Sequence, residues 1–236
     1  MIRPKNEKEI EAMRQAGALA NHVLLETAKS IQPGVTTEEI DQIAAKCIEG
    51  LGAKSAFIGY KGYPCHTCIS VNEEVVHGIA GSRRIDVGDI ISLDVGVVYG
   101  GFIGDNALTV AAGGCTVEKQ ALMDVTETSL QEGISQAVAG NRVSDISRAI
   151  QEYVEANGMS VVREFVGHGV GRSMHEEPQI PNYVDGGSSP RPKAGMTIAI
   201  EPMVNLGAPE VQIYLGKRQK ECKYKWMMFA LAAVRH

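Results

Sequence analysis

The fold of this chain is decided by the stretch Asp89 to Val110, which reads DIISLDVGVVYGGFIGDNALTV. Residues Ile90 to Val97 are typical of a β-strand, a turn signal follows at Tyr99-Gly100-Gly101, and strand-like residues then resume. The stretch therefore predicts a β-hairpin.

Two aspartates in this hairpin, Asp94 and Asp105, predict a bound cation. A turn with an even number of residues directs both side chains to one face of the sheet, whereas an odd number sends them to opposite faces. A two-residue turn at Tyr99-Gly100 would place them directly opposite each other, with Cβ atoms roughly 4.5–5.5 Å apart. Two carboxylates that close need a shared proton or a cation between them, and we favour the cation.

Metal-binding residue types continue in the second half of the chain, with His168 and His175 in GHGVGRSMHEEP and Glu201 in IAIEPM. Three carboxylates and an imidazole form an oxygen-rich set, which suits Mn²⁺, Fe²⁺ or Co²⁺ better than the sulfur-rich sites of structural zinc. Taken singly, each acid is more often paired with a basic side chain, and His77 or His175 is more often a structural histidine. Asp94 and Glu201 fit that alternative least, because each lies within an apolar strand.

Length and composition indicate a globular protein of the cytoplasm. The 236 residues are 44% hydrophobic, and the formal net charge of −5 gives no electrostatic case for nucleic acid as the main partner. The N-terminal stretch lacks a signal-peptide core, and no apolar run is long enough to cross a membrane. Five scattered cysteines indicate reduced thiols. We expect a monomer with no nucleic-acid motif.

The pair Cys65 and Cys68 has the C-x-x-C spacing of zinc or redox sites. There is no second such pair, and the surroundings lack the strand-to-helix setting of thioredoxin-like proteins. The pattern therefore favours two buried or half-buried thiols that line a pocket.

The helical segments indicate an internal repeat. A long helix over Asn6 to Ile31 precedes a shorter helix that begins at Thr36, where Thr36 and Glu39 have capping-box spacing. The segments Thr116 to Ala139 and Ser144 to Asn157 repeat this order. The second helix is expected to bury one apolar stripe, formed by Ile40, Ile43, Cys47 and Leu51.

The strand motifs repeat as well. Gly88 to Asp94 matches Gly195 to Glu201, with a carboxylate at the same distance from the glycine, and a His-Gly pair precedes each strand at His77-Gly78 and His168-Gly169. A site between the halves would gather acids and imidazoles from both. No low-complexity linker divides the halves, so we expect one domain over residues 1–236.

Four segments resemble the type 1 methionine aminopeptidases, which have the pita-bread metallopeptidase fold: GYPCHTCISVNEEVVHGI, DIISLDVGVVYGGFIGDNALTV, VGHGVGRSMHEEPQIPNY and AGMTIAIEPMVN. The resemblance implies an α+β fold in which two pairs of helices, related by a pseudo-twofold repeat, cover a curved and mainly antiparallel sheet. It also implies a cytosolic enzyme that removes the initiator methionine from nascent proteins when the next residue is small.

The resemblance implies a metal-ligand set formed by Asp94, Asp105, His168 and Glu201, in which Asp105 bridges two ions and His168 and Glu201 hold the second one. The ions would be Co, Mn, Fe or Zn, two per chain in the family. In the mechanism that follows, metal-activated water attacks the first peptide carbonyl, and Glu201 or a water beside it handles the proton.

The resemblance also implies the substrate contacts. His77 and His175 would touch the scissile peptide and stabilise the tetrahedral intermediate. Phe57 and Met174 differ from the residues that we associate with the methionine pocket. The wall residues that match are Tyr60, Tyr63 and Cys68.

The resemblance ends near residues 210–213, and residues 214–236 form a divergent tail, typical of a frameshift or a divergent terminus. The family pattern has a further strand there, with a glutamate that bridges both metals. Glu210 and Glu221 are the remaining acids, and neither lies in that motif. We therefore expect about one tightly bound metal, reduced activity, and an unpaired sheet edge where the terminal strands would lie. The run Met227 to Val234 would cover part of that edge in a register that its sequence does not give.

Two alternatives remain open. One is an Xaa-Pro-directed aminopeptidase of the same fold, although such relatives usually carry an additional N-terminal domain. The other is a non-catalytic binding protein of this fold that associates transiently with the ribosome, for which the basic tail is weak support.

Overall fold

The computed structural model describes residues 2, 4–187, 189–212, 225–227 and 230–233, with strand pairing alone for the last two ranges. The four expected helices are all present in these ranges, and both pairs follow the predicted order. Capping boxes begin the first two helices, at Asn6 and at the predicted Thr36. None of the described helices is long and apolar enough to cross a membrane. The helices are α1 (Glu7–Ala28), α2 (Thr37–Gly50), α3 (Val117–Gln136) and α4 (Val143–Ala156).

The strands form three antiparallel sheets in the described residues. The first joins β1 (Lys54–Ser55), β2 (Cys68–Val71), β3 (Ile90–Tyr99) and β4 (Phe102–Ala111). The second joins β5 (Ser160–Val161), β9 (Met203–Asn205) and β10 (Lys225–Met227). The third joins β6 (Gly167–Gly169), β7 (Glu176–Ile180), β8 (Thr197–Ile200) and β11 (Ala230–Ala233).

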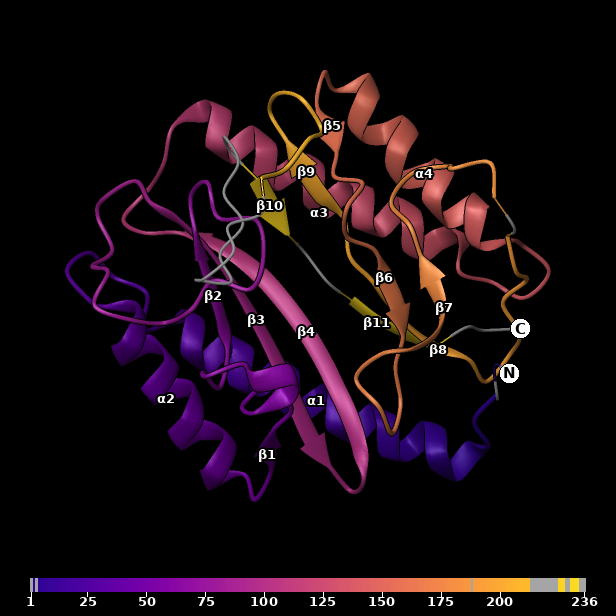
Figure 1. Ribbon diagram of the computed structural model, residues 1–236, viewed down its shortest axis with the longest axis horizontal. Helices are drawn as coiled ribbons and strands as arrows, with labels where there is room; N and C mark the ends of the chain where they lie inside the picture. Colours follow the sequence, from indigo (N-terminus) through magenta and orange to yellow (C-terminus); the bar gives the residue numbers. More distant parts are fainter. Residues whose placement is uncertain (1, 3, 188, 213–224, 228–229, 234–236) are drawn as a thin grey trace.

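Helices α1 and α2 cover the hairpin of β3 and β4, and α3 and α4 cover the strands of the second half (Figure 1). Alternate residues of β3, from Ile91 to Val97, pack under the first helix pair. In α2 the buried stripe runs through Ile40, Ala44 and Ile48, whereas Ile43 is 38% exposed. The prediction for Ile43 was wrong, because the helical period turns its side chain away from the stripe.

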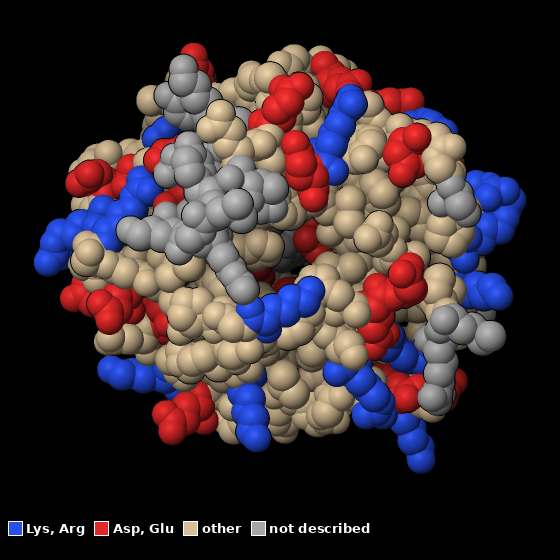
Figure 2. All heavy atoms as spheres, viewed as in Figure 1, with Lys and Arg blue, Asp and Glu red and all other residues tan. Residues whose placement is uncertain are grey.

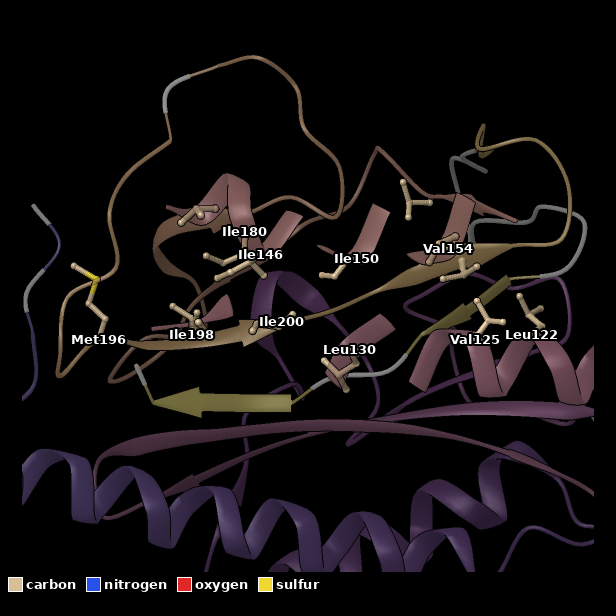
Figure 3. Packing of buried hydrophobic residues seen from close by; sticks show 14 of the residues in the cluster. Leu122, Val125, Leu130, Ile146, Ile150, Val154, Ile180, Met196, Ile198 and Ile200 are labelled. Atoms are coloured by element: carbon tan, nitrogen blue, oxygen red, sulfur yellow. The ribbon is translucent and has the colours of Figure 1, made fainter. Parts of the chain in front are cut away.

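The second half has its own core between α3, α4 and β8 (Figure 3). In β8, Ile198 and Ile200 point into this core beside Ile146 and Ile150. Strand alternation then turns the neighbouring positions of β8 the other way, toward the first half. Glu201 directly follows the strand on that side.

The register of the central hairpin differs in detail from the sequence prediction. Its two-residue turn is Gly100-Gly101, since Tyr99 pairs with Phe102. The even length places Asp94 and Asp105 on one face, as predicted, but Asp105 pairs with Gly96 and not with Asp94. The two aspartates are therefore diagonal neighbours, because both glycines of the turn adopt positive φ and shift the loop by one residue from the predicted position.

The predicted unpaired edge does not occur. Strand β11 pairs with β8, with Ala230 opposite Ile200, and β10 pairs with β9. A strand offers backbone donors and acceptors whatever its side chains, so a divergent sequence still completes the sheet. Glu221, one of the two acids that follow Glu201, lies outside the described residues.

Candidate active site

A pocket of about 210 Å³ lies between the two halves of the molecule. Figure 2 shows a hollow near the middle of one face, with acidic side chains visible inside it. The floor is buried and carries the acids, whereas His77, His175 and Lys61 at the rim are exposed. The lining residues are Phe57, Tyr60, Lys61, Tyr63, Cys68, His77, Asp94, His168, Met174, His175 and Glu201.

Three buried side chains converge at one point of the floor. Ligand atoms of Asp105, His168 and Glu201 all lie within 4.8 Å of one another. Nε2 of His168 is 3.1 Å from Oε1 of Glu201 and 3.7 Å from Oδ2 of Asp105. Nδ1 of the same ring lies 2.9 Å from the carbonyl of Gly169, a contact that a proton on Nδ1 satisfies. With Nδ1 held in this way, Nε2 is the ring atom that would bind a metal ion once it gives up its proton.

Asp94 lines the same pocket but lies outside this tight group. It sits on the face of the hairpin that carries Asp105, and Cys68 pairs with it across β2 and β3. Burial, reinforced by the charges of Asp105 and Glu201, holds the pKa of Asp94 well above its usual range. The first half thus supplies two acids, and the second half supplies an imidazole and a third acid.

The raised pKa values of the floor acids show that their ionised forms are unfavourable when no cation is bound. Burial raises the pKa of Asp105 to about 7, helped by the charge of Glu201 and opposed by His168. Burial also raises the pKa of Glu201. Burial lowers the pKa of His168, but Glu201 and Asp105 outweigh it and raise the value to about 9. Carboxylates forced together in a dry site favour a bound cation.

The donor set fits a divalent metal. Oδ1 of Asp94 and Oδ1 of Asp105 are buried and have no hydrogen-bond partner within the described part of the chain. Buried polar atoms without protein partners are rare, and such atoms commonly bind an ion or an ordered water. Three carboxylates with one imidazole suit a hard or borderline divalent ion.

Two histidines occupy the rim. The ring of His175 lies 4.3 Å from that of His168, and Oη of Tyr60 is 2.9 Å from its Nδ1. Although His175 is exposed as a whole, partial desolvation of its imidazole lowers the pKa to about 4, helped by the positive charges of His168 and Lys61 and by His77. His77 has a φ of 60° and stands edge-on to Phe165, with ring centroids 5.9 Å apart. Both imidazoles line the pocket, and the lowered pKa of His175 leaves its ring neutral at pH 7.

Comparison with known proteins places this site in a family. The model of the metallopeptidase family M24 matches residues 11–224. The chain belongs to metallopeptidase family M24. A methionine aminopeptidase of Clostridium perfringens is 48% identical over 212 residues, which are 90% of this chain and 85% of that protein. This similarity puts the chain among the methionine aminopeptidases of the family.

Solved structures agree with this assignment. The crystal structure of a methionine aminopeptidase from Thermotoga maritima gives a TM-score of 0.96 at 40% identity, covering 99% of this chain and 96% of that one. A prolidase from Pyrococcus furiosus gives a TM-score of 0.78 at 21% identity and is covered over 63% of its length, so it shows the fold alone. The expected α+β pita-bread architecture is confirmed, and the aminopeptidase interpretation is favoured over the Xaa-Pro alternative.

In this M24 pocket the predicted wall residues Tyr60, Tyr63 and Cys68 all line the cavity. Tyr63 donates to the carbonyls of Gly78 at 2.7 Å and Thr67 at 3.2 Å, which fixes its ring. Cys68 is buried and free, and burial raises the pKa of its thiol, so it behaves as an apolar wall.

Two groups outside the pocket support its walls and were not found from the sequence. The buried carboxylate of Asp41 on α2 accepts from the backbone N–H groups of His66 and Thr67 and from the Thr67 hydroxyl, at 2.7–3.3 Å, next to Cys68. Glu176 Oε1 accepts from the N–H groups of Arg172 and Ser173 and therefore shapes the loop before His175. In a sequence, an acid such as Asp41, which binds the N–H groups of a distant loop, cannot be told from any other polar helix residue.

Lys61 is the lining residue that sequence reasoning missed. It has a φ of 48° and lies between Gly59 and Gly62, which also have positive φ. Within GYKGYP it looks like any exposed lysine of a loop, so only the folded turn shows that it lines the pocket.

Proposed function

We propose that this chain removes the N-terminal methionine of polypeptides by metal-dependent hydrolysis of the first peptide bond. The observation that best supports this function is the buried group of Asp105, His168 and Glu201 at the closed end of an apolar pocket. A pocket of about 210 Å³ with a buried floor accommodates a chain end and no continuous chain. This geometry supports an exopeptidase over an endopeptidase.

The metal would be held by Asp94, Asp105, His168 and Glu201. When bound, a divalent ion supplies Lewis-acid chemistry by lowering the pKa of water and polarising a carbonyl. The described residues offer these four ligands; Glu210 is exposed and does not line the pocket. We infer one tightly held ion, because a second cation nearby would lack a compensating carboxylate.

The substrate would bind with its first side chain against the apolar wall and its amine toward the acids. Phe57, Tyr63, Cys68 and Met174 are buried and form the wall. The flexible thioether of Met174 and the edge of Phe57 suit a methionine side chain, since sulfur and aromatic contacts are favourable. The first amine, if positively charged, is attracted by the carboxylates of the floor.

Catalysis would use an acid on the floor of the pocket together with the two histidines at its rim. Glu201 would accept the proton of the attacking water and return it to the departing amine. A neutral His175 that accepts the Tyr60 hydrogen at Nδ1 keeps its own proton on Nε2, where it donates to the developing oxyanion. His77 would hold the scissile peptide from the other side.

The direct test is release of methionine from Met-Ala-Ser in the presence of Mn²⁺ or Co²⁺, with N-acetyl-Met-Ala-Ser as the matched control. We expect release from the free peptide alone. Equal cleavage of both peptides would overturn the aminopeptidase assignment, and faster cleavage of Xaa-Pro peptides would replace methionine by proline specificity. We also propose that the protein acts as a monomer on nascent chains in the cytoplasm. A transient association with the ribosome is a further prediction.

A further inference from the structure

Lys61 is the one lysine or arginine among the described residues that line the pocket. Its side chain is exposed, whereas the acids of the floor are buried. Its rim neighbours are Tyr60, His77 and His175. A single cation thus stands at the mouth of a site whose floor is acidic.

The turn holds Lys61 in a conformation that a lysine rarely adopts. Its φ of 48° and ψ of 29° are left-handed, between Gly59 with φ 79° and Gly62 with φ 77°. A glycine would occupy this position without strain, whereas any side chain there is strained. Strained residues cluster at functional sites, so this conformation points to a role for the Lys61 side chain.

The lysine side chain is held over the pocket by an aromatic ring. Nζ lies 5.3 Å from the centroid of the Tyr60 ring, within cation–π range, and Tyr60 in turn contacts His175. No carboxylate in the described part of the chain forms an ion pair with Lys61. The described residues therefore leave this charge available to a ligand that passes the rim.

A substrate whose first residue fills the pocket would bring its third residue near the ammonium group of Lys61. On the proposed function the pocket would take the first residue, and His77 and His175 would contact the first peptide bond, so the residues that follow would cross the rim where Lys61 lies. We propose that Lys61 is a specificity-determining residue that favours substrates with a carboxylate side chain on the third residue. This inference rests on the proposed function, because it assumes that the chain end enters the pocket.

The test compares Met-Ala-Asp-Ser, Met-Ala-Asn-Ser and Met-Ala-Lys-Ser with the wild-type protein and with Lys61→Met and Lys61→Glu. Both variants keep a non-glycine residue at positive φ, so they alter charge and not the backbone preference of the turn. Lys46→Met is the matched control, since Lys46 is exposed on α2 and does not line the pocket.

We expect the wild type to cleave the Asp peptide about two- to five-fold more efficiently than the Asn peptide, the range of an exposed ion pair. The ratio should fall toward one in Lys61→Met, reverse in Lys61→Glu, and stay unchanged in Lys46→Met. High salt should reduce the wild-type ratio, because screening weakens an exposed pair. A wild-type ratio of one, or a ratio that Lys61→Met leaves intact, overturns the inference.

Binding of the same peptides with the first bond reduced to CH₂–NH, measured by calorimetry, separates the two proposals. These peptides cannot be hydrolysed, so their relative Kd values report Lys61 without turnover. Failure to release methionine from Met-Ala-Asn-Ser, with charge-dependent binding intact, rejects the proposed function and keeps only the contact between Lys61 and the third residue of a bound peptide. Release of methionine with charge-independent binding and cleavage rejects the inference and keeps the proposed function.

Discussion

The hydroxyl of Tyr60 lies 2.9 Å from Nδ1 of His175, and the two rings stack with centroids 5.7 Å apart. The pKa of His175 is lowered to about 4, chiefly by burial, so the ring is neutral at pH 7. A neutral ring that accepts at Nδ1 carries its proton on Nε2. If the phenol donates to Nδ1, it selects the tautomer whose Nε2 proton is available to the substrate.

Tyr60→Phe should therefore lower kcat and leave KM for Met-Ala-Ser nearly unchanged. The ring stacking persists and one neutral hydrogen bond is lost, which corresponds to about a two- to ten-fold decrease in kcat. Steady-state kinetics measure both constants. Tyr99→Phe is the control, because Tyr99 is 38% exposed at the end of β3, away from the pocket. An unchanged kcat in Tyr60→Phe would remove Tyr60 from the mechanism.

Two glycines of the central hairpin predict different consequences of the same substitution. A Cβ on Gly96 would lie 2.5 Å from Cε1 of Phe57 and 2.8 Å from Cε of Met174, both in the methionine wall. These side chains can shift, so Gly96→Ala should narrow the pocket and raise KM for Met-Ala-Ser. Thermal unfolding should change little, and a KM equal to that of the wild type would contradict the assigned wall.

Gly104→Ala should instead destabilise the fold. A Cβ there would lie 2.1 Å from the carbonyl oxygen of Ala16, where the backbone of α1 rests on β4. A backbone atom in a packed helix cannot move aside, so we expect a loss of about 2–3 kcal/mol in the free energy of unfolding. Denaturant titration of the two alanine variants in parallel measures the contrast.

The sequence predicted most of the architecture and the floor of the site, because these depend on periodic patterns. Strand alternation set the shared face of Asp94 and Asp105, and the repeat of the Gly88 and Gly195 motifs predicted that Glu201 would join them. The directly opposed register failed because a three-residue turn signal allows two positions for a two-residue turn. Lys61 and Asp41 were missed because their roles depend on contacts between segments far apart in the chain. Periodicity carries no information about such contacts.

The ligand assignment predicts that two substitutions at the site will differ in metal content. Asp105→Ala removes a buried ligand of the central group and should abolish metal-dependent activity together with most of the bound metal. His77→Ala should lower turnover and leave metal content nearly intact, because His77 is exposed at the rim. Elemental analysis of both purified variants decides the matter. Equal loss of metal in the two would show that the roles are misassigned.

The ion pair of Lys5 and Glu176 predicts a pH-dependent contribution to stability. Lys5 Nζ lies 3.0 Å from Glu176 Oε2 and ties the N-terminal segment to the loop before His175. Burial raises the pKa of Glu176, but hydrogen bonds from Lys5, Ser173 and Arg172 outweigh it and lower the value. A lowered carboxyl pKa stabilises the fold above the unfolded value of about 4.3 and loses this effect as the pH falls through the folded value.

Lys5→Met should therefore cost about 1 kcal/mol at pH 7, after allowance for solvent screening of this half-buried pair. The difference from the wild type should shrink below about pH 4 as Glu176 becomes protonated. Lys8→Met, an exposed lysine of α1, is the control. Chemical denaturation at pH 7 and pH 3.5 measures the effect, and an equal cost at both values would show that the pair acts through packing alone.

The number of tightly bound metal ions is the last prediction. The described residues place Asp105, His168 and Glu201 in one group with Asp94 beside it, and they offer no further acid in the pocket. Two divalent ions would carry four positive charges against three carboxylates, so the second ion should bind weakly. Calorimetric titration of the metal-free protein with Mn²⁺ should give about one tight site per chain, and Asp105→Ala should eliminate it. Two tight sites of similar affinity would show that Glu210, Glu221 or another group replaces the lost ligand. Activity that requires a second equivalent of metal would point to the same group.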